Sequence, residues 1–89
     1  MAHVKFVAPL TKFTEKETIH VEAKDVRELC KELIKRFNLD KSLLLDEEEN
    51  LSKSIILMVN RRNAFTLKGA DTKVNDQTEV LIMQFFGGG

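Results

Sequence analysis

The sequence has few of the features that tie a protein to a membrane, an oxidising compartment or nucleic acid. Its single cysteine, Cys30, cannot form an internal disulfide and fits a reducing compartment. No apolar run approaches the ~20 residues of a membrane span, and the first residues contain no signal-peptide core. Fourteen basic and fourteen acidic residues cancel, so no overall field attracts a polyanion. These absences predict a cytoplasmic protein with neither a membrane nor a nucleic-acid partner.

The residue patterns of enzymes and metal sites are also missing. His3, His20 and Cys30 do not have the spacing of metal ligands. The acidic run at residues 46–49 lacks the alternating ligands and central glycine of a calcium loop, which favours a solvated loop. There is no nucleophile elbow, phosphate-binding glycine loop or Ser-His-Asp set. The sequence therefore predicts a protein that is not an enzyme by itself, with no bound cofactor and no metal site.

The strongest structural pattern is an amphipathic helix that begins after Asp25. Asp25 and Glu28 have the spacing of a capping box, and Asn38 suits the left-handed end of a helix. Between them, apolar residues recur at helical spacing: Val26, Leu29, Cys30, Leu33, Ile34 and Phe37. This stripe makes Cys30 a small core residue rather than a nucleophile.

Strand patterns surround this helix. Alternating apolar residues predict a hairpin of residues 3–8, ended by Pro9, and residues 18–22, with His20 facing outward. Residues 40–53 fit neither period and read as a loop with at most one short helical turn, held to the core by a leucine or two. Residues 54–60 are apolar on both faces, which predicts a strand covered on more than one side. The remaining predictions are a turn at residues 60–63, a short strand at 64–67 closed by Gly69, a turn at 75–77 and a last strand at 79–84.

The order of elements is therefore β-β-α-β-β-β in one domain, because 89 residues have room for a single core. A hairpin, one helix and further strands favour an α+β fold with the helix packed across one face of a mixed sheet. That is the outline of a ubiquitin-like β-grasp fold. A ferredoxin-like arrangement needs a second substantial helix, which residues 40–51 supply poorly.

The chain ends in three glycines, Gly87, Gly88 and Gly89, directly after the last apolar strand. A glycine run cannot pack a core, so we expect a β-grasp domain over residues 1–84 and a flexible tail over residues 85–89. A carboxylate without neighbouring side chains can enter a narrow enzyme pocket. Activation by ATP in a partner enzyme would convert it to an acyl-adenylate, which a sulphur donor or an amine can attack.

The sequence resembles the MoaD/ThiS sulphur carriers, a branch of the ubiquitin-like proteins, over nearly its whole length. Residues 4–8 (VKFVA) are similar to the first strand of the family. Residues 58–60 (MVN) resemble the end of its "vaVN" strand, and residues 71–80 (DTKVNDQTEV) resemble its "dTxLxdGDeV" segment. The terminal glycines complete the resemblance.

This resemblance implies a carrier whose terminal Gly89 is adenylated and converted to a thiocarboxylate, with Gly88 as the approach and Gly87 as the hinge. The implied partners are a ubiquitin-activating-like adenylating enzyme and a sulphur acceptor. In a MoaD-like protein the acceptor is the large subunit of molybdopterin synthase, in molybdenum cofactor biosynthesis. A ThiS-like role in thiazole synthesis, a protein modifier that forms isopeptide bonds with lysine, and an inert tail remain as alternatives.

Three features depart from the family pattern. Gln77 stands where the family favours glycine; if that position needs a positive φ, glutamine would cost about 1 kcal/mol unless the turn is rebuilt. The usual prolines before the tail are absent, and a third glycine is present. In place of the prolines stand Phe85 and Phe86, of which we expect one ring to cap the core and the other to anchor a partner.

Overall fold

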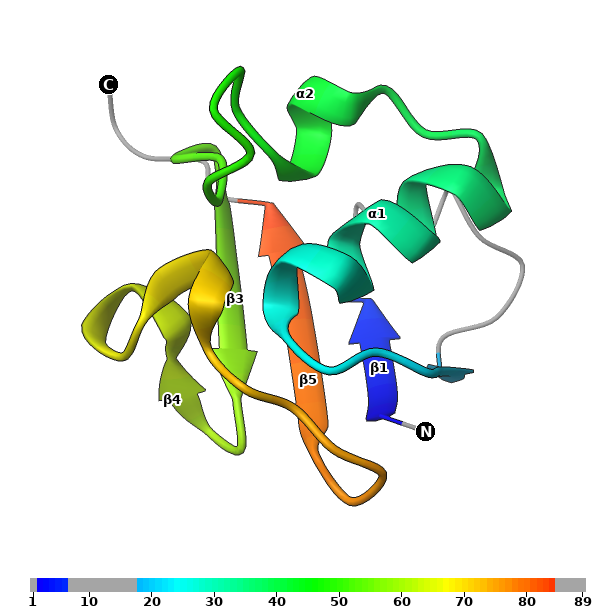
Figure 1. Ribbon diagram of the computed structural model, residues 1–89, viewed down its shortest axis with the longest axis vertical. Coiled ribbons are helices and arrows are strands. Elements are labelled where there is room, and N and C mark those ends of the chain that lie inside the picture. Colours follow the sequence, from blue (N-terminus) through cyan, green and yellow to red (C-terminus); the bar gives the residue numbers. More distant parts are fainter. Residues whose placement is uncertain (1, 7–17, 85–89) are drawn as a thin grey trace.

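A computed structural model of the chain describes residues 2–6 and 18–84 (Figure 1). The strands are β1 (Ala2–Phe6), β2 (Thr18–Val21), β3 (Ile55–Val59), β4 (Arg62–Asn63) and β5 (Glu79–Gln84). The helices are α1 (Val26–Phe37) and the single turn α2 (Lys41–Leu44), followed later by the 3-10 turns η2 (Ala64–Thr66) and η3 (Gly69–Asp71).

The strands form one mixed sheet in the order β2-β1-β5-β3-β4. β1 and β5 are parallel neighbours with Val4 opposite Val80, and the other pairs are antiparallel. Strands from the two ends of the chain thus lie side by side at the centre of the sheet. This topology, with one main helix across it, is the ubiquitin-like β-grasp fold that the sequence predicts.

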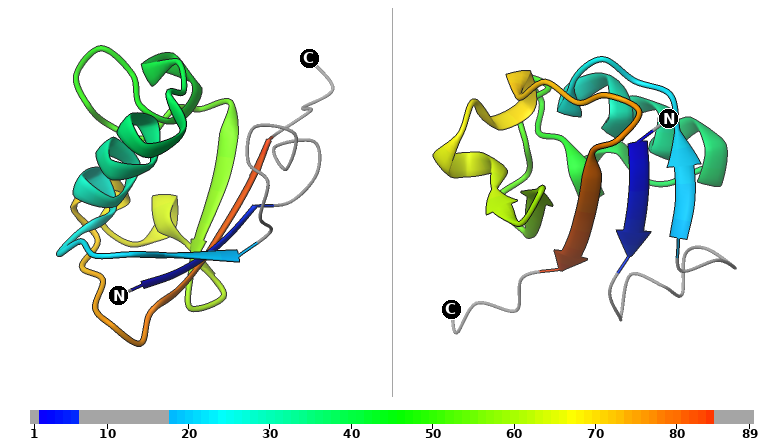
Figure 2. Two further views of the ribbon diagram at one scale, coloured as in Figure 1. Left: turned by 90° about the vertical axis from the view of Figure 1, so that its right-hand side faces the viewer. Right: turned by 90° about the horizontal axis from the view of Figure 1, so that it is seen from below.

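The core lies between the sheet and the two helices, which are on the same side of the sheet (Figure 2). β1 alternates between buried and exposed residues, as its sequence predicts, and Val4 and Phe6 point inward. The Phe6 ring meets the Phe37 ring of α1 edge to face, with 6.3 Å between centroids. The predicted helical stripe is the face that packs here, with Val26, Leu29, Cys30 and Leu33 fully buried.

Both predicted ends of α1 are confirmed. The Asp25 carboxylate accepts a hydrogen bond from the Glu28 N–H at 2.8 Å, which satisfies one of the free donors of the first turn. Asn38 ends the helix in the left-handed conformation, with φ of 52°. These local signals are strong because each satisfies backbone groups that the helix leaves unpaired.

The segment predicted as a loop with a short helical turn is confirmed in outline. Asp40 caps α2, and the chain then forms a compact loop that returns to β3. Three leucines, Leu44, Leu45 and Leu51, are buried and hold this loop against the core.

The predicted strand at residues 64–67 is wrong. The antiparallel partner of β3 is β4, which lies within the residues predicted as a turn, and the reversal is confined to Asn60 and Arg61. Both have positive φ, 50° and 70°, as in the tight two-residue turns that match the twist of a hairpin. After Asn63 the chain coils into η2, because the Asn63 side chain accepts a hydrogen bond from the Phe65 N–H at 2.9 Å.

The turn before β5 is rebuilt without glycine. Within the described ranges, positive φ among other residues is confined to Asn38, Glu49, Asn60 and Arg61, and Gln77 is not one of them. The Asn75 side chain accepts a hydrogen bond from the Gln77 N–H at 2.8 Å, and the Thr78 hydroxyl accepts one from the Asn75 N–H at 2.8 Å. An asparagine-nucleated turn therefore replaces the one that needs glycine.

Candidate functional site

The residues predicted to carry the function, Phe85, Phe86, Gly87, Gly88 and Gly89, lie outside the residues that the structure describes. The structure instead defines the base of this segment and the surface around it.

In the part of the chain that is described, no helix is long and apolar enough to cross a membrane.

The base is the central strand β5. Residues 79–82 of β5 pair with β1, and its last residue, Gln84, pairs with Ile55 at the start of β3. β5 is therefore paired on both sides over residues 79–82 and with β3 at its end. Gly89 is the fifth residue after Gln84, and a fully extended chain of five residues spans at most about 17 Å.

The sheet face opposite the helices carries an apolar patch next to this base. It consists of two cross-strand pairs: Ile56 is opposite Met83, and Met58 is opposite Leu81. All four side chains are half-buried, and Lys5 stands beside Leu81 on β1. We call these four residues the open-face patch. Contiguous, partly exposed apolar side chains are typical of a docking surface.

The prediction that β3 is covered on more than one side is confirmed for one face among the described residues, whereas the other face is only half-buried. Ile55, Leu57 and Val59 are buried under the helices, but α1 and α2 leave the face of Ile56 and Met58 uncovered (Figure 2). The apolar residues on both sides of β3 could have indicated this patch. The same pattern is also typical of a strand buried on both faces, which is what the sequence predicts.

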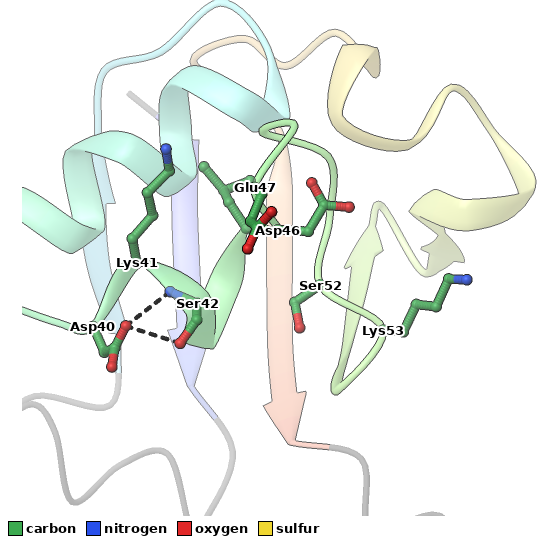
Figure 3. Close-up of a pocket in the computed structure, with 8 residues that line it drawn as sticks. Asp40, Lys41, Ser42, Asp46, Glu47, Ser52 and Lys53 are labelled. Atoms are coloured by element: carbon green, nitrogen blue, oxygen red, sulfur yellow. Dashed lines mark hydrogen bonds between the residues drawn. The ribbon is translucent and has the colours of Figure 1, made fainter.

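A hollow of about 700 Å³ lies beside α2 (Figure 3). It is lined by Asp40, Lys41, Ser42, Leu45, Asp46, Glu47, Ser52 and Lys53. The Asp40 carboxylate accepts hydrogen bonds from the Ser42 hydroxyl at 2.8 Å and the Ser42 N–H at 3.0 Å, and these bonds lower the pKa of Asp40. Asp40 therefore acts here as the cap of α2.

The other candidates from the sequence have structural roles. Burial raises the pKa of the Cys30 thiol to about 12, which leaves it protonated and unreactive at neutral pH. His3 and His20 are exposed cross-strand neighbours whose rings meet edge to face, with 4.5 Å between centroids. No group of three or more potential metal ligands is found among residues 2–6 and 18–84.

The acidic run at residues 46–49 is folded on itself. The Asp46 carboxylate accepts hydrogen bonds from the Glu48 and Asn50 N–H groups, at 2.8 and 3.0 Å. Glu49 pairs with Lys31 at 2.9 Å and with Lys41 at 3.5 Å, and the hydrogen bond from Lys31 lowers the pKa of Glu49. These contacts close a loop and do not build a cation site.

Comparison with known proteins agrees with this geometry. The profile of the ThiS family matches residues 4–89. A structure of the Amycolatopsis orientalis BexX/CysO complex contains a chain with 22% identity and a TM-score of 0.87, covering 100% of both chains. The small archaeal modifier protein 1 (SAMP1) of Methanosarcina acetivorans has 23% identity and a TM-score of 0.84, covering 99% of this chain and 95% of its own. Urm1 of Sulfolobus solfataricus has 23% identity and a TM-score of 0.68, covering 93% and 99%. Comparison with curated protein sequences gives no match.

The fold is that of the ubiquitin-like proteins. The chain belongs to the ThiS family, since the family profile spans almost its entire length, and this family comprises small ubiquitin-like sulphur carriers.

Proposed function

We propose that this protein carries sulphur as a thiocarboxylate on Gly89. The observation that supports the proposal is the family match, which extends through residue 89 and so includes the terminal glycines. The position of β5 supports it further, because Gln84, the last described residue before the glycine segment, is paired with Ile55 of β3 in the sheet. Gly88 and Gly87 have no side chains to obstruct a partner's pocket.

The chemistry requires two steps in a partner enzyme. The Gly89 carboxylate attacks the α-phosphorus of ATP and releases pyrophosphate, which forms an acyl-adenylate. A sulphur nucleophile then attacks the acyl carbon and expels AMP, so that one carboxylate oxygen is replaced by sulphur. The partner supplies the electrostatic stabilisation and the nucleotide, and the carrier supplies the acyl group and the surface that is recognised. Because ATP is consumed, we place the protein in the cytoplasm.

Docking is assigned to the open-face patch together with Phe85 and Phe86. The patch is apolar and lies at the base of the segment that must enter the partner. An aromatic anchor adjoining such a patch supplies the desolvated centre that strong interfaces require.

The role that we propose is MoaD-like, with the large subunit of a molybdopterin synthase as the final sulphur acceptor. The residue patterns at 58–60 and 71–80 support this choice. ThiS-like delivery to thiazole synthesis uses the same activated group. A modifier role has one observation in its favour: the fold is similar to that of an archaeal protein described as a modifier.

The first experiment measures intact mass after incubation with an activating enzyme, ATP and a sulphur donor. We expect a gain equal to the replacement of one oxygen by sulphur, and no gain when Gly88 and Gly89 are deleted. An unchanged mass with activating enzymes of the pterin and thiazole pathways would contradict the carrier function. Lysine residues linked to this protein's terminal glycine in cell digests would favour the modifier instead.

The second experiment tests the docking face. Leu81→Lys places a charge in the open-face patch, so we expect a higher KM for activation with kcat nearly unchanged, because the glycine segment itself is intact. Thr18→Lys, at an exposed position of β2 that is separated from Leu81 by β1, is the matched control and should leave both constants unchanged. Equal effects of the two variants would show that activation does not use this patch.

A further inference from the structure

The second surface that calls for an explanation is formed by residues 61–73, which include β4, η2 and η3. Figure 1 shows these turns beyond β3, on the side of the molecule away from β1 and β2. The segment contains the two large hydrophobic residues that are most exposed in the described structure: Phe65, 45% exposed, and Leu67, 38% exposed. Neither is part of the open-face patch.

Four cations accompany these side chains: Arg61, Arg62, Lys68 and Lys73. None of them has an ion pair with another residue in ranges 2–6 and 18–84. The one carboxylate of the segment, Asp71, is already paired with Arg27 of α1. The segment therefore presents positive charge without a counter-charge of its own.

The surface is also hollowed. Leu67, Lys68, Thr72 and Lys73 line a depression of about 450 Å³. Leu67 supplies an apolar wall, and lysine side chains can cover apolar surface with their aliphatic stems while their ammonium groups stay in water. This combination suits an apolar side chain that enters the hollow with acidic neighbours on either side.

The backbone around the hollow is organised in advance. The Lys68 N–H donates to the Thr72 hydroxyl at 3.1 Å, and the Leu67 N–H donates to the Ala64 carbonyl at 3.0 Å. The Val26 N–H of α1 donates to the Thr72 carbonyl at 2.9 Å, which ties the segment to the helix. A surface that is already ordered loses little conformational entropy on binding.

We propose that residues 61–73 form a docking surface for an acidic segment of a partner protein that carries an apolar anchor residue. The charge complementarity of the rim and the apolar walls of the hollow select this occupant. A nucleic acid fits less well, because the whole chain has no net charge and the depression suits a side chain rather than a tracking backbone. The proposal does not depend on thiocarboxylate formation, since it uses none of the terminal residues.

The test uses the full chain and three labelled peptides. The first has a central phenylalanine flanked by glutamates, the second has serine at the centre, and the third has glutamines in place of the glutamates. We expect the first to bind about tenfold more tightly than either of the others. Amide shift changes in NMR spectra should be confined to residues 61–74 and the adjoining start of α1.

A charge-reversal variant locates the site. Lys68→Glu with Lys73→Glu should weaken binding of the phenylalanine peptide at least about tenfold. Lys35→Glu with Lys53→Glu changes the net charge equally at exposed sites elsewhere and should alter binding by less than about twofold. Unchanged melting temperatures of both variants show that the fold is intact.

Several results would overturn the proposal. If the serine peptide binds as tightly as the phenylalanine peptide, the attraction is non-specific and the hollow binds no apolar anchor. If Lys35→Glu with Lys53→Glu weakens binding as much as Lys68→Glu with Lys73→Glu, the peptide does not bind at residues 61–73. Tighter binding of a single-stranded oligouridylate through Lys68 and Lys73 would assign the surface to nucleic acid, and concentration-dependent dimerisation abolished by the charge reversal would assign it to a second copy of this chain.

Discussion

Two loop regions of opposite charge flank α1, and they use the same kinds of residue in opposite ways. In residues 40–51 the leucines are buried, and Asp40, Asp46 and Glu49 bond to neighbouring backbone or lysine groups. In residues 61–73 Phe65 and Leu67 are exposed, and the cations have no ion pair in the described structure. The side chains of residues 40–51 stabilise the fold, whereas those of residues 61–73 remain available to a partner.

Arg27 joins the two regions. Its Nε donates to the Glu49 carbonyl at 2.8 Å, and its guanidinium also pairs with Asp71. The hydrogen bond with Asp71 raises the pKa of Arg27. The comparison teaches that charge and hydrophobicity along a loop do not reveal its role. What matters is whether the surrounding fold satisfies those groups.

The largest effect is expected from Leu44→Ala in the acidic region. Leu44 is fully buried, so the truncation leaves a cavity in the core and should lower the free energy of unfolding by about 2–5 kcal/mol. Urea denaturation measures this loss. A change below about 1 kcal/mol would mean that the loop is not anchored as described.

The next effect is expected from Arg61→Gly in the basic region. Arginine at φ of 70° is strained, so glycine should raise the free energy of unfolding by about 0.5–1 kcal/mol. Arg62→Gly removes the same charge from an extended residue of β4, and it should instead lower stability by a similar amount. If the two variants shift the urea midpoint in the same direction, the turn is not strained. Both should weaken binding of the acidic peptide.

A smaller effect is expected from Glu49→Gln, and it should depend on pH. Because the folded pKa of Glu49 is lowered, its ion pairs stabilise the fold fully above the unfolded glutamate pKa of about 4.3. This contribution is lost as the pH falls through the folded value. The difference in melting temperature between the parent protein and the variant should therefore be present at neutral pH and vanish in acid.

Glu48→Gln is the matched control, since Glu48 has no ion pair among the described residues. Its melting temperature should follow that of the parent protein across the same pH range. A pH-dependent difference as large as that of Glu49→Gln would show that overall charge, rather than the Lys31 contact, is responsible.

The smallest effect on stability is expected from Leu67→Ala. The side chain is 38% exposed, so truncation should change the free energy of unfolding by no more than about 0.5 kcal/mol. The same substitution removes one wall of the hollow and should weaken binding of the phenylalanine peptide. A stability loss comparable to that of Leu44→Ala would show that Leu67 stabilises the fold as much as the buried leucines of residues 40–51 do.

Much of the fold was predictable because its signals are local. The spacing of Asp25 and Glu28, the apolar stripe ending at Phe37 and the left-handed Asn38 depend on neighbours within a few residues. The predicted strand at residues 64–67 is wrong because the β-forming residues there compete with the turn and cap residues just before them. Two of those residues are β formers, but the Asn63 cap and the tight turn at Asn60 placed the strand earlier.

The candidate site was predictable only in part. The glycines are conspicuous in the sequence, but the open-face patch was not recognised, because apolar residues on both sides of β3 also fit a strand buried on both faces. The sequence predicts a strand over the exposed residues Phe65 and Leu67. No pattern in the sequence predicts the hollow beside them.

By itself, the sequence determined the order of strands and helix, the ends of α1 and the glycines that follow the last strand, because these depend on period, capping and glycine's missing side chain. Tertiary structure alone decided that β5 lies between β1 and β3, that Ile56, Met58, Leu81 and Met83 are only half-buried, and that the basic region faces outward. The physical reason is that periodicity reports which residues share a face. Whether that face is buried depends on distant segments that pack against it.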